Sequence, residues 1–229
     1  MFVPGLAAAG DELVIAGEEA HYLRRVVRIR AGERVTASDG EGTLAELTVL
    51  DAGSELRAEV GVRRSITRAC RLDVWCGAPE GDRADWLVEK LAELGVASLR
   101  LVDCERTQWE RAAKKSERWE RLAVAALRQS RSAYRMFIEA PVPIAALLET
   151  PPDFAVSYLA DPGGGSFVAH RQAGPRSIGA AVGPSGGFSD EERKSLEASS
   201  FVPTRLTESR LRTETAALAI AALVLAAGE

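Results

Sequence analysis

The sequence is poor in residues that bind metals or form disulfides. Its 229 residues include three cysteines and two histidines, and no two cysteines form a C-x-x-C pair. Three cysteines do not build a disulfide framework, and the set is too small for a typical zinc site of cysteines and histidines. We therefore expect neither disulfides nor a bound metal.

Long hydrophobic runs are also missing. The longest apolar stretch, residues 216–227, has 12 residues, whereas a helix needs about 20 to cross a bilayer. The first residues, MFVPGLAAAGDELV, carry neither the basic start nor the long apolar stretch of a secretory signal. We expect a soluble, cytoplasmic protein without a membrane anchor. Hydrophobic residues make up 46% of the chain and charged residues 27%, which is typical of a globular protein with one large domain or two unequal ones.

An excess of positive charge is absent from the whole chain but present in two segments. The net charge is −4, yet residues 105–135 hold nine Lys or Arg against four Glu, and a second basic run lies in residues 24–30. Charge runs are often only solvated surfaces, but their concentration in an acidic protein favours contact with nucleic-acid phosphates. The candidates for this contact are Arg24, Arg25, Arg28, Arg30, Arg106, Arg128 and Arg131.

The sequence changes character after about residue 68. Short alternating stretches separated by glycines predict a small β-barrel in residues 1–68, with one helix at residues 18–27. Beyond residue 68, apolar runs alternate with amphipathic segments, which is typical of an α/β domain with a mainly parallel sheet. The expected strands are 72–76, 99–103, 154–160, 178–182 and 202–206, and the expected helices are 82–94, 114–129, 189–199 and 213–227.

A glycine-rich loop, G-P-S-G-G-F at residues 183–188, follows one of these strands. Ser189 and Glu192 come next and form the pattern of a capping box at a helix start. Ligands of α/β sheets bind at such strand ends. The loop matches neither the dinucleotide pattern G-x-G-x-x-G nor the phosphate loop G-x-x-x-x-G-K-[ST]. A tight turn without a ligand fits the pattern as well as a binding loop does.

A second unusual segment is L-T-E-S-R-L-R-T-E-T-A at residues 206–216. Thr213 and Glu214 suit a first helical turn, because threonine can cap the helix and glutamate interacts favourably with its dipole. Arg212 does not suit this position, since a helix N-terminus repels a cation. A bound anion or polar ligand explains Arg212 better.

Six segments occur in an order typical of one enzyme family. They are AHYLRRVVRIRAGERV (20–35), GDRADWLVEKLAELGV (81–96), ERTQ (105–108), RWERLAVAALRQS (118–130), VGPSGGFS (182–189) and LRTETA (211–216). Together they cover most of the chain, and the last two are the most specific. The chain therefore resembles the RsmE-type 16S ribosomal RNA uridine-N3 methyltransferases of the SPOUT class.

The resemblance implies a fold, a cofactor and partners. It implies a PUA-like β-barrel at residues 1–68 that helps to hold RNA, with Arg24, Arg25 and Arg28 facing the RNA. It further implies an α/β methyltransferase domain with a trefoil knot at residues 69–229, which forms a homodimer and acts on ribosomal RNA or the small ribosomal subunit. The residues that it assigns to S-adenosylmethionine are Leu159, Ala160, Asp161, Val182, Gly183, Pro184, Gly186, Gly187, Leu206, Ser209, Leu211, Arg212, Thr215 and Ala216.

The implied reaction is methyl transfer to N3 of uridine. The N3 proton must be lost, and a guanidinium can stabilise the resulting uracil anion. Arg212 is therefore the expected catalytic residue, and Glu214 is a weaker candidate for a general base. No metal is needed. The helix at 213–227 is apolar on nearly every face, so we expect it in the knotted core or at a subunit contact.

Several positions depart from the family pattern. Ser185 replaces the glutamate of G-P-E-G-G, and Thr207, Ser209 and Arg210 replace a glycine, an arginine and an aliphatic residue. The other departures are Arg128, Ser132 and Met136. Two alternatives stay open: a diverged relative that binds RNA without catalysis, and a methyltransferase with a different RNA target. An α/β enzyme with another nucleotide cofactor is disfavoured, because its glycine fingerprints are missing.

Overall fold

The computed structural model describes residues 1–53, 55–110, 112–167 and 177–227. The chain separates into two compact units. Met1–Arg68 and Leu127–Arg135 form the first unit, and Ala69–Ala126 and Met136–Glu229 form the second.

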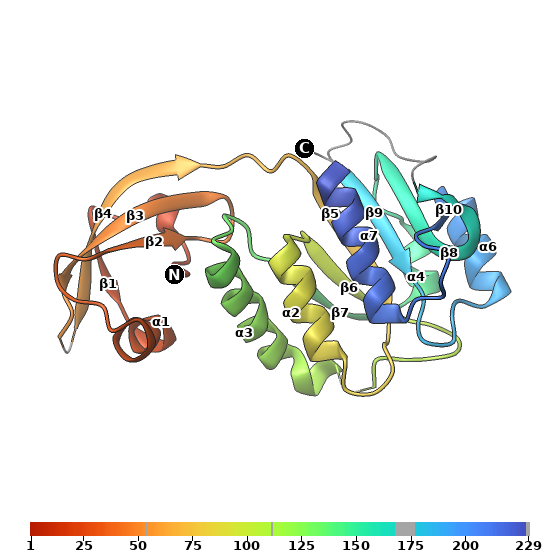
Figure 1. The fold of residues 1–229 in the computed structure, drawn as a ribbon, viewed down its shortest axis with the longest axis horizontal. Helices are drawn as coiled ribbons and strands as arrows, with labels where there is room; N and C mark the ends of the chain where they lie inside the picture. The colour runs from red at the N-terminus through yellow and green to blue at the C-terminus, as the bar shows by residue number, and fades with distance from the viewer. Residues whose placement is uncertain (54, 111, 168–176, 228–229) are drawn as a thin grey trace. The chain divides into compact units, whose positions relative to one another are not determined.

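Among the described residues, the first unit is built on a curled antiparallel sheet of four strands in the order β1-β4-β3-β2 (Figure 1). Residues of β4 alternate between core and solvent, so Leu56, Ala58 and Val60 are buried while Arg57 and Glu59 are exposed. This period of two is the signal from which the sequence predicts strands. The elements are a 3-10 turn (Leu6–Ala8), β1 (Glu12–Ile15), α1 (Gly17–Tyr22), a π-helical turn (Leu23–Val27), β2 (Arg34–Ser38), β3 (Thr43–Asp51) and β4 (Leu56–Ser65).

Residues 127–135 pack with the first unit, although the sequence analysis places them in the C-terminal domain. The backbone N–H of Gly42 donates to the carbonyl oxygen of Ala133 (2.9 Å), and that of Arg135 donates to the carbonyl oxygen of Gly40 (2.9 Å). These partners are far apart in the sequence, so no local pattern reveals them. The segment 127–135 thus belongs to the first compact unit, while the expected domain division at residue 68 stays a prediction.

In the described part of the second unit, six parallel strands form a sheet in the order β10-β8-β9-β5-β6-β7. The expected strands and helices of this unit are all present. The elements are β5 (Arg71–Gly77), α2 (Ala84–Leu94), β6 (Ser98–Asp103), α3 (Ala112–Ser130), β7 (Phe137–Pro143), α4 (Ile144–Glu149), β8 (Val156–Ser166), β9 (Ser177–Val182), α6 (Asp190–Ala198), β10 (Phe201–Arg205) and α7 (Thr213–Ala227). Neither β7 nor α4 is among the elements expected from the sequence. β7 contains Pro141 and Pro143, and prolines disfavour strands, but β7 is an edge strand and such strands tolerate them.

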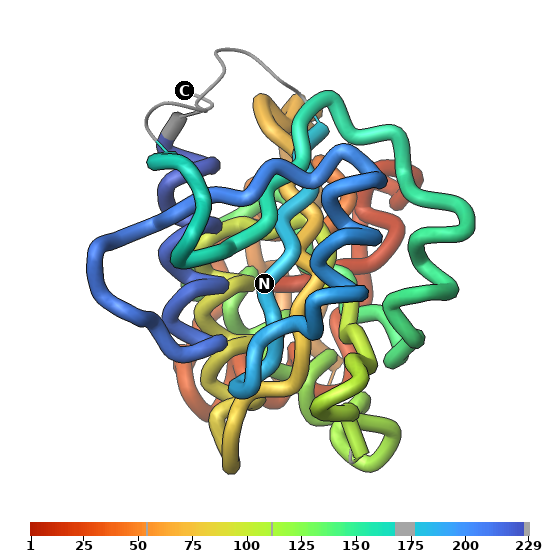
Figure 2. The backbone as a smooth tube through the Cα atoms, turned by 90° about the vertical axis from the view of Figure 1, so that its right-hand side faces the viewer, coloured from red at the N-terminus to blue at the C-terminus, as the bar shows by residue number. Residues whose placement is uncertain are grey.

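Helices cover both faces of this sheet. Leu72 and Val74 of β5 lie in one core with residues of α2, α3 and α7. Trp75, the next residue after Val74, lies in a second core with Leu147 of α4 and Leu196 of α6. Figure 2 shows α7 (dark blue) and α6 (light blue) on opposite sides of the central strands. A strand covered on both faces is mostly apolar, and β5 is apolar from Val74 to Cys76, while the buried Asp73 accepts a hydrogen bond from the Ser98 hydroxyl (2.7 Å).

The C-terminal helix α7 is apolar on nearly every side, but one of its faces is exposed in the single chain. Ala217, Ile220, Ala221 and Val224 are buried, whereas Leu223 is 37% exposed. Packing within the chain therefore accounts for only part of this apolar surface. Among the described helices, none combines the length and the apolarity needed to span a membrane.

Candidate active site

Loops at the ends of three neighbouring strands enclose a cavity of about 500 Å³ in the second unit. The strands β8, β9 and β10 are adjacent and parallel, so their carboxyl ends lie at the same edge of the sheet. This edge is the usual place for a ligand in an open parallel sheet. The volume is in the range of small-molecule sites, about 300–1,000 Å³.

Nearly all residues that the sequence assigns to the cofactor line this cavity. They are Leu159, Ala160, Asp161, Val182, Gly183, Pro184, Gly187, Leu206, Ser209, Leu211, Arg212 and Ala216. Gly186 and Thr215 are not part of the lining, and their assignment to the cofactor stays a prediction. The two expected catalytic residues, Arg212 and Glu214, do line it. The fold thus brings together three segments that are separate in the sequence.

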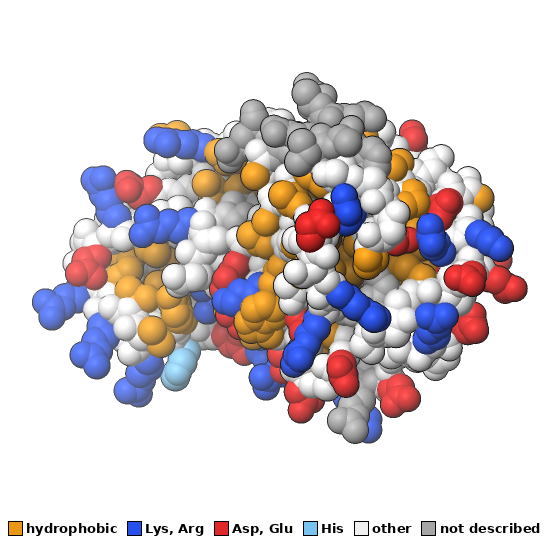
Figure 3. Space-filling model, turned by 45° about the vertical axis from the view of Figure 1, so that its right-hand side comes forward, with side chains coloured by type: hydrophobic (Ala, Val, Ile, Leu, Met, Phe, Trp, Pro, Cys, Tyr) orange, Lys and Arg blue, Asp and Glu red, His pale blue; other side chains and the backbone are white. Residues whose placement is uncertain are grey.

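The cavity wall carries both acidic and basic side chains. Acidic and basic side chains are also interspersed over the surface of the second unit that Figure 3 shows. Asp161 and Arg193 form an ion pair (2.9 Å), and Arg193 also contacts Glu197 (3.0 Å). Sequence reasoning misses two of the arginines in the lining, Arg193 and Arg83. Arg83 lies in the 81–96 segment that carries the family resemblance, and this is the one signal that could have found it.

Glycines let the loop after β9 lie directly against the end of β5. A Cβ atom at Gly77 would lie 2.4 Å from the backbone nitrogen of Pro184, and one at Gly183 would lie 3.0 Å from that of Phe188. Gly187 has a φ of +72°, which favours glycine, and its N–H donates to the carbonyl oxygen of Pro184 (2.8 Å) to close a turn. Side chains at Gly77 and Gly183 would force this loop away.

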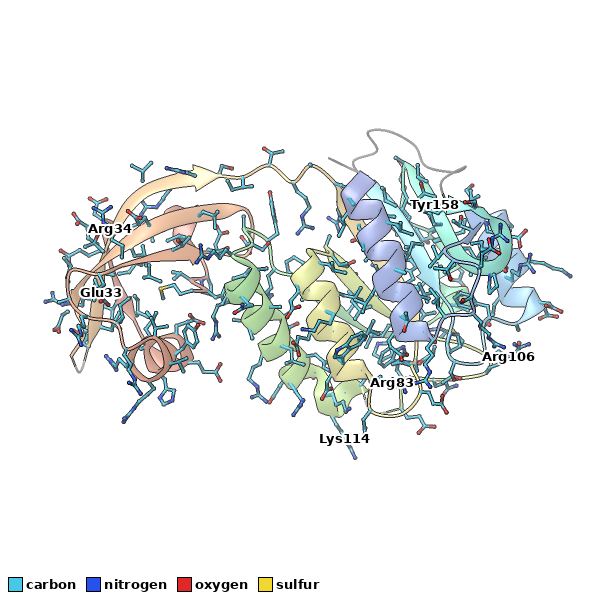
Figure 4. The ribbon with its side chains drawn as sticks, in the orientation of Figure 1. Glu33, Arg34, Arg83, Arg106, Lys114 and Tyr158 are labelled. Carbon is cyan, nitrogen blue, oxygen red and sulfur yellow. The ribbon has the colours of Figure 1, made fainter. Side chains whose placement is uncertain are left out.

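The loop after β6 holds the glycine loop in place. The Glu192 carboxylate accepts hydrogen bonds from the backbone N–H of Ser189 (2.8 Å), within a capping box, and from that of Glu105 (2.7 Å). Arg106 donates from Nη1 to the carbonyl oxygen of Gly186 (2.7 Å). The guanidinium of Arg106, which the sequence assigns to RNA, is therefore bound to the glycine loop (Figure 4).

Two contacts hold the start of α7 at the cavity. The Thr213 hydroxyl donates to the carbonyl oxygen of Gly183 (3.0 Å), and Arg83 Nη1 donates to Glu214 Oε1 (2.6 Å). Glu214 is buried, with 5% of its surface exposed. Arg212 is exposed, and none of the described residues forms an ion pair with it. Arg212 is thus available to a ligand, whereas Glu214 is engaged by Arg83.

The thiols of the second unit are buried. Burial raises the pKa of Cys104 to about 12, and the nearby carboxylates of Glu192 and Asp103 add to this increase. Burial also raises the pKa of Cys76. Since the thiolate is the nucleophile and the metal ligand, neither cysteine is suited to these roles. No group of three or more His, Cys, Asp or Glu side chains within the described residues is arranged to hold a metal ion.

A second cavity, of about 840 Å³, lies in the first unit and is lined in part by His21, Arg24 and Arg25. Arg28 and Arg30 follow this segment and are exposed, and Arg28 has a φ of +59° at the end of the π-helical turn. Lys and Arg side chains gather over the first unit on the face shown in Figure 3. The segment thus presents a basic surface.

Arg128 and Arg131 differ from each other in their surroundings. Arg128 forms an ion pair with Glu19 (2.8 Å) and lies over the Tyr22 ring at 4.9 Å, and 16% of its side chain is exposed. Arg131 is exposed. Arg128 therefore stabilises the first unit from within, and the assignment of Arg128 and Arg131 to RNA stays a prediction.

Comparison with known proteins identifies the family of both parts of the chain. Residues 67–225 match a family model described as "RNA methyltransferase domain", and residues 15–61 match one described as "RNA methyltransferase PUA domain". The first of these matches covers more than half of the chain. The α/β fold and the PUA-like domain expected from the resemblance are thereby confirmed.

Relatives of the chain carry one name. Ribosomal RNA small subunit methyltransferase E of Mycobacterium tuberculosis is 31% identical over 235 residues, covering 94% of this chain and 87% of the relative. The Bacillus subtilis protein of that name is 27% identical over 222 residues, with coverages of 89% and 86%. The solved structure of the Neisseria gonorrhoeae protein of that name, bound to S-adenosyl methionine, has a TM-score of 0.85 at 26% identity and covers 97% of this chain and 94% of that one. This chain therefore belongs to the ribosomal RNA small subunit methyltransferase E family.

Proposed function

We propose that this protein transfers a methyl group from S-adenosylmethionine to N3 of a uridine in the 16S ribosomal RNA of the small subunit. The cavity formed by the loops of β8, β9 and β10 carries the proposal, because it lies in the part of the chain that matches the RNA methyltransferase family. The names of the relatives support the substrate class. The uridine-N3 target follows from the family resemblance.

The residues of the cavity fit S-adenosylmethionine. This ligand carries a carboxylate, an ammonium and a sulfonium group, and the lining offers acidic and basic side chains, including Asp161 and Arg212. Gly183 and Gly187 of the glycine loop line the cavity without side chains, so that an adenine can approach the backbone there. The strand and loop residues 159–161, 182–184 and 206–212 would hold the ligand from three sides.

Arg212 is the proposed catalytic residue. When bound, the cofactor supplies a methyl group on a positively charged sulfur. A nucleophilic nitrogen can bond to this methyl carbon, and the sulfur then leaves as a neutral thioether. Uridine N3 lies on the Watson–Crick edge, so the base must be unpaired or turned out of its stack. Loss of the N3 proton leaves negative charge on the uracil oxygens. The exposed Arg212 guanidinium can donate hydrogen bonds to O2 or O4 and stabilise this anion.

Glu214 is not the base in this proposal. Its carboxylate is buried and accepts a hydrogen bond from Arg83. A general base must reach the proton that it removes, whereas Glu214 is buried and its Oε1 already accepts the hydrogen bond from Arg83. The N3 proton is therefore assigned to solvent.

RNA is proposed to contact the basic segment of the first unit. Arg24 and Arg25 line the cavity there, and Arg28 and Arg30 are exposed. Phosphate contacts of this kind weaken steeply with salt. Arg131, which is also exposed, is a further candidate for contact with RNA.

We also propose that the second unit contains the trefoil knot of the family and forms a homodimer. The strand order supports the knot. β9 and β10 lie on opposite sides of β8, so the chain passes across β8 on its way from β9 to β10, and it then returns so that α7 packs against α2 and β5.

Exposed apolar side chains support the dimer. Trp86 of α2 is 47% exposed and Leu223 of α7 is 37% exposed, and the two helices pack against each other. Because ribosomes provide the proposed substrate, we propose a cytoplasmic location.

Methyl transfer from labelled S-adenosylmethionine to small ribosomal subunits that lack uridine-N3 methylation tests the function. Nucleoside mass spectrometry should identify N3-methyluridine, and Arg212→Ala should lower turnover about 100-fold or more. A folded protein that binds the cofactor but modifies no nucleotide would be the non-catalytic RNA-binding relative. A different methylated nucleoside, or methylation of another RNA, would show a different target. Absence of cofactor binding would reject the assignment of the cavity.

A further inference from the structure

An ion pair between Arg83 and Glu214 lies at the proposed methylation site, and neither the reaction nor RNA binding as proposed above uses it. Arg83 immediately precedes α2, and Glu214 is the second residue of α7. Their Nη1 and Oε1 atoms are 2.6 Å apart, and 39% of the Arg83 side chain but only 7% of the Glu214 side chain is exposed. A buried carboxylate is unfavourable without a partner. Arg83 is therefore what allows Glu214 to stay buried.

The pair lies two residues from the proposed catalytic arginine. Arg212 directly precedes α7, and two contacts beyond it hold the start of this helix, namely the ion pair and the Thr213 hydrogen bond to the carbonyl oxygen of Gly183. The carbonyl oxygen of Arg212 accepts a hydrogen bond from the N–H of Ala216 (2.8 Å), so its backbone is part of the same turn. The anchored backbone thus fixes the point from which the Arg212 side chain extends.

We propose that Arg83 is a positioning residue, whose ion pair with Glu214 locks the first turn of α7 and directs the Arg212 guanidinium toward the reacting base. Figure 4 shows Arg83 at the end of the second unit where α7 begins. The inference rests on the proposed function. It assigns Glu214 to anchoring and not to proton transfer.

Glu214→Gln separates these two roles. The glutamine keeps an oxygen that can accept the Arg83 hydrogen bond, but it cannot take up a proton at neutral pH. If Glu214 is an anchor, E214Q should keep turnover within about tenfold of the wild type, and the shape of the pH profile should be unchanged. If Glu214 is a general base, turnover should fall at least about 100-fold, and the acidic limb of that profile should change. This second result would overturn the proposal.

Arg83→Met tests the anchor from the other side. Misplacing a catalytic group by about 1 Å costs about 100-fold, so we expect kcat to fall about 100-fold while the Kd for S-adenosylmethionine, measured by calorimetry, rises less. Arg83→Lys keeps the charge and should restore part of the turnover. Arg100→Met is the control for the loss of an arginine–glutamate ion pair away from the site, because Arg100 pairs with Glu139 at 2.7 Å in the same unit and does not line the cavity. It should leave kcat unchanged.

A double-mutant cycle on the cofactor-free protein provides a readout that does not depend on activity. Urea unfolding of R83M, Glu214→Leu and the double variant should show coupling of about tenfold in the unfolding equilibrium constant, because each single change removes the ion pair. No coupling, or R83M with wild-type turnover, would refute the positioning role alone. If the wild-type protein transfers no methyl group, the proposed function fails, and the role of Arg83 in catalysis fails with it.

Discussion

Replacing Gly77 with alanine should displace the loop that borders the cavity. The added Cβ would lie 2.4 Å from the backbone nitrogen, 2.6 Å from Cδ and 2.9 Å from Cα of Pro184, whereas ordinary contacts begin at 3.4 Å. A backbone and a proline ring cannot rotate away as a flexible side chain can. The loop of residues 183–187 therefore has to retreat by about 1 Å, the difference between the ordinary contact and the shortest distance.

The magnitude of the effect follows from this displacement. Overpacking of this kind lowers the free energy of unfolding by about 1–3 kcal/mol. A shift of about 1 Å in a loop that positions the reactants lowers turnover about 100-fold. We expect the affinity for S-adenosylmethionine to fall at least about tenfold, which corresponds to about 1.4 kcal/mol of binding free energy.

Calorimetric titration with S-adenosylmethionine and urea unfolding of Gly77→Ala measure both effects. Gly186→Ala in the same loop is the matched control, because its Cβ would meet Cδ of Arg106 at 3.5 Å, an ordinary contact, and its φ lies outside the left-handed region. This control should bind the cofactor within about twofold of the wild type. A Gly77→Ala protein with equally unchanged affinity would refute the argument that close packing of the loop on β5 shapes the site.

Three further predictions concern the thiols, Asp85 and Arg106. Because burial raises the pKa of Cys104 to about 12 and all three cysteines are buried, native protein at pH 8 should react with a thiol reagent far more slowly than urea-unfolded protein; equal rates would contradict this. Burial raises the pKa of Asp85, but the hydrogen bond from Trp119 and two nearby cations outweigh burial and hold the pKa below 3.8. This stabilisation is therefore present above about pH 4 and is lost as the pH falls through the lowered pKa. Urea unfolding should show Asp85→Asn to be about 1 kcal/mol less stable than the wild type at pH 7, with a smaller difference at pH 3, and a constant difference would exclude this titration as the cause. Arg106→Ala should weaken S-adenosylmethionine binding about fivefold and leave RNA affinity unchanged, since its guanidinium binds Gly186; loss of RNA affinity alone would restore the assignment made from the sequence.

Interactions between near neighbours in the chain are encoded in local sequence, and these were predictable. Ser189 and Glu192 indicate the start of α6, because a capping box depends on two residues three positions apart. Gly95 ends α2 with a φ of +87°, a conformation that glycine adopts readily. The mostly apolar segment of β5, interrupted only by Asp73 after its first residues, indicates a strand buried on both faces.

The approximate location of the cavity was predictable for a related reason. The family resemblance implied that the segments 159–161, 183–187 and 206–216 hold the cofactor. Their meeting is consistent with a parallel sheet, which brings the carboxyl ends of its strands to one edge. Most of their nominated residues line the cavity. Gly186 and Thr215 lie in these segments but do not line the cavity, because the contact of each residue with the cavity depends on the path of its loop.

Tertiary structure alone decided which charged groups are engaged by partners within the chain. Arg128 and Arg106 look like RNA-binding residues in a basic segment, but Arg128 pairs within the first unit and Arg106 binds the carbonyl oxygen of Gly186. Glu214 looks like a possible base, but it is buried against Arg83. These partners lie far away in the sequence and approach only when the chain folds. Local sequence therefore identifies the charged residues, while the long-range packing determines whether each one contacts a ligand or another part of the protein.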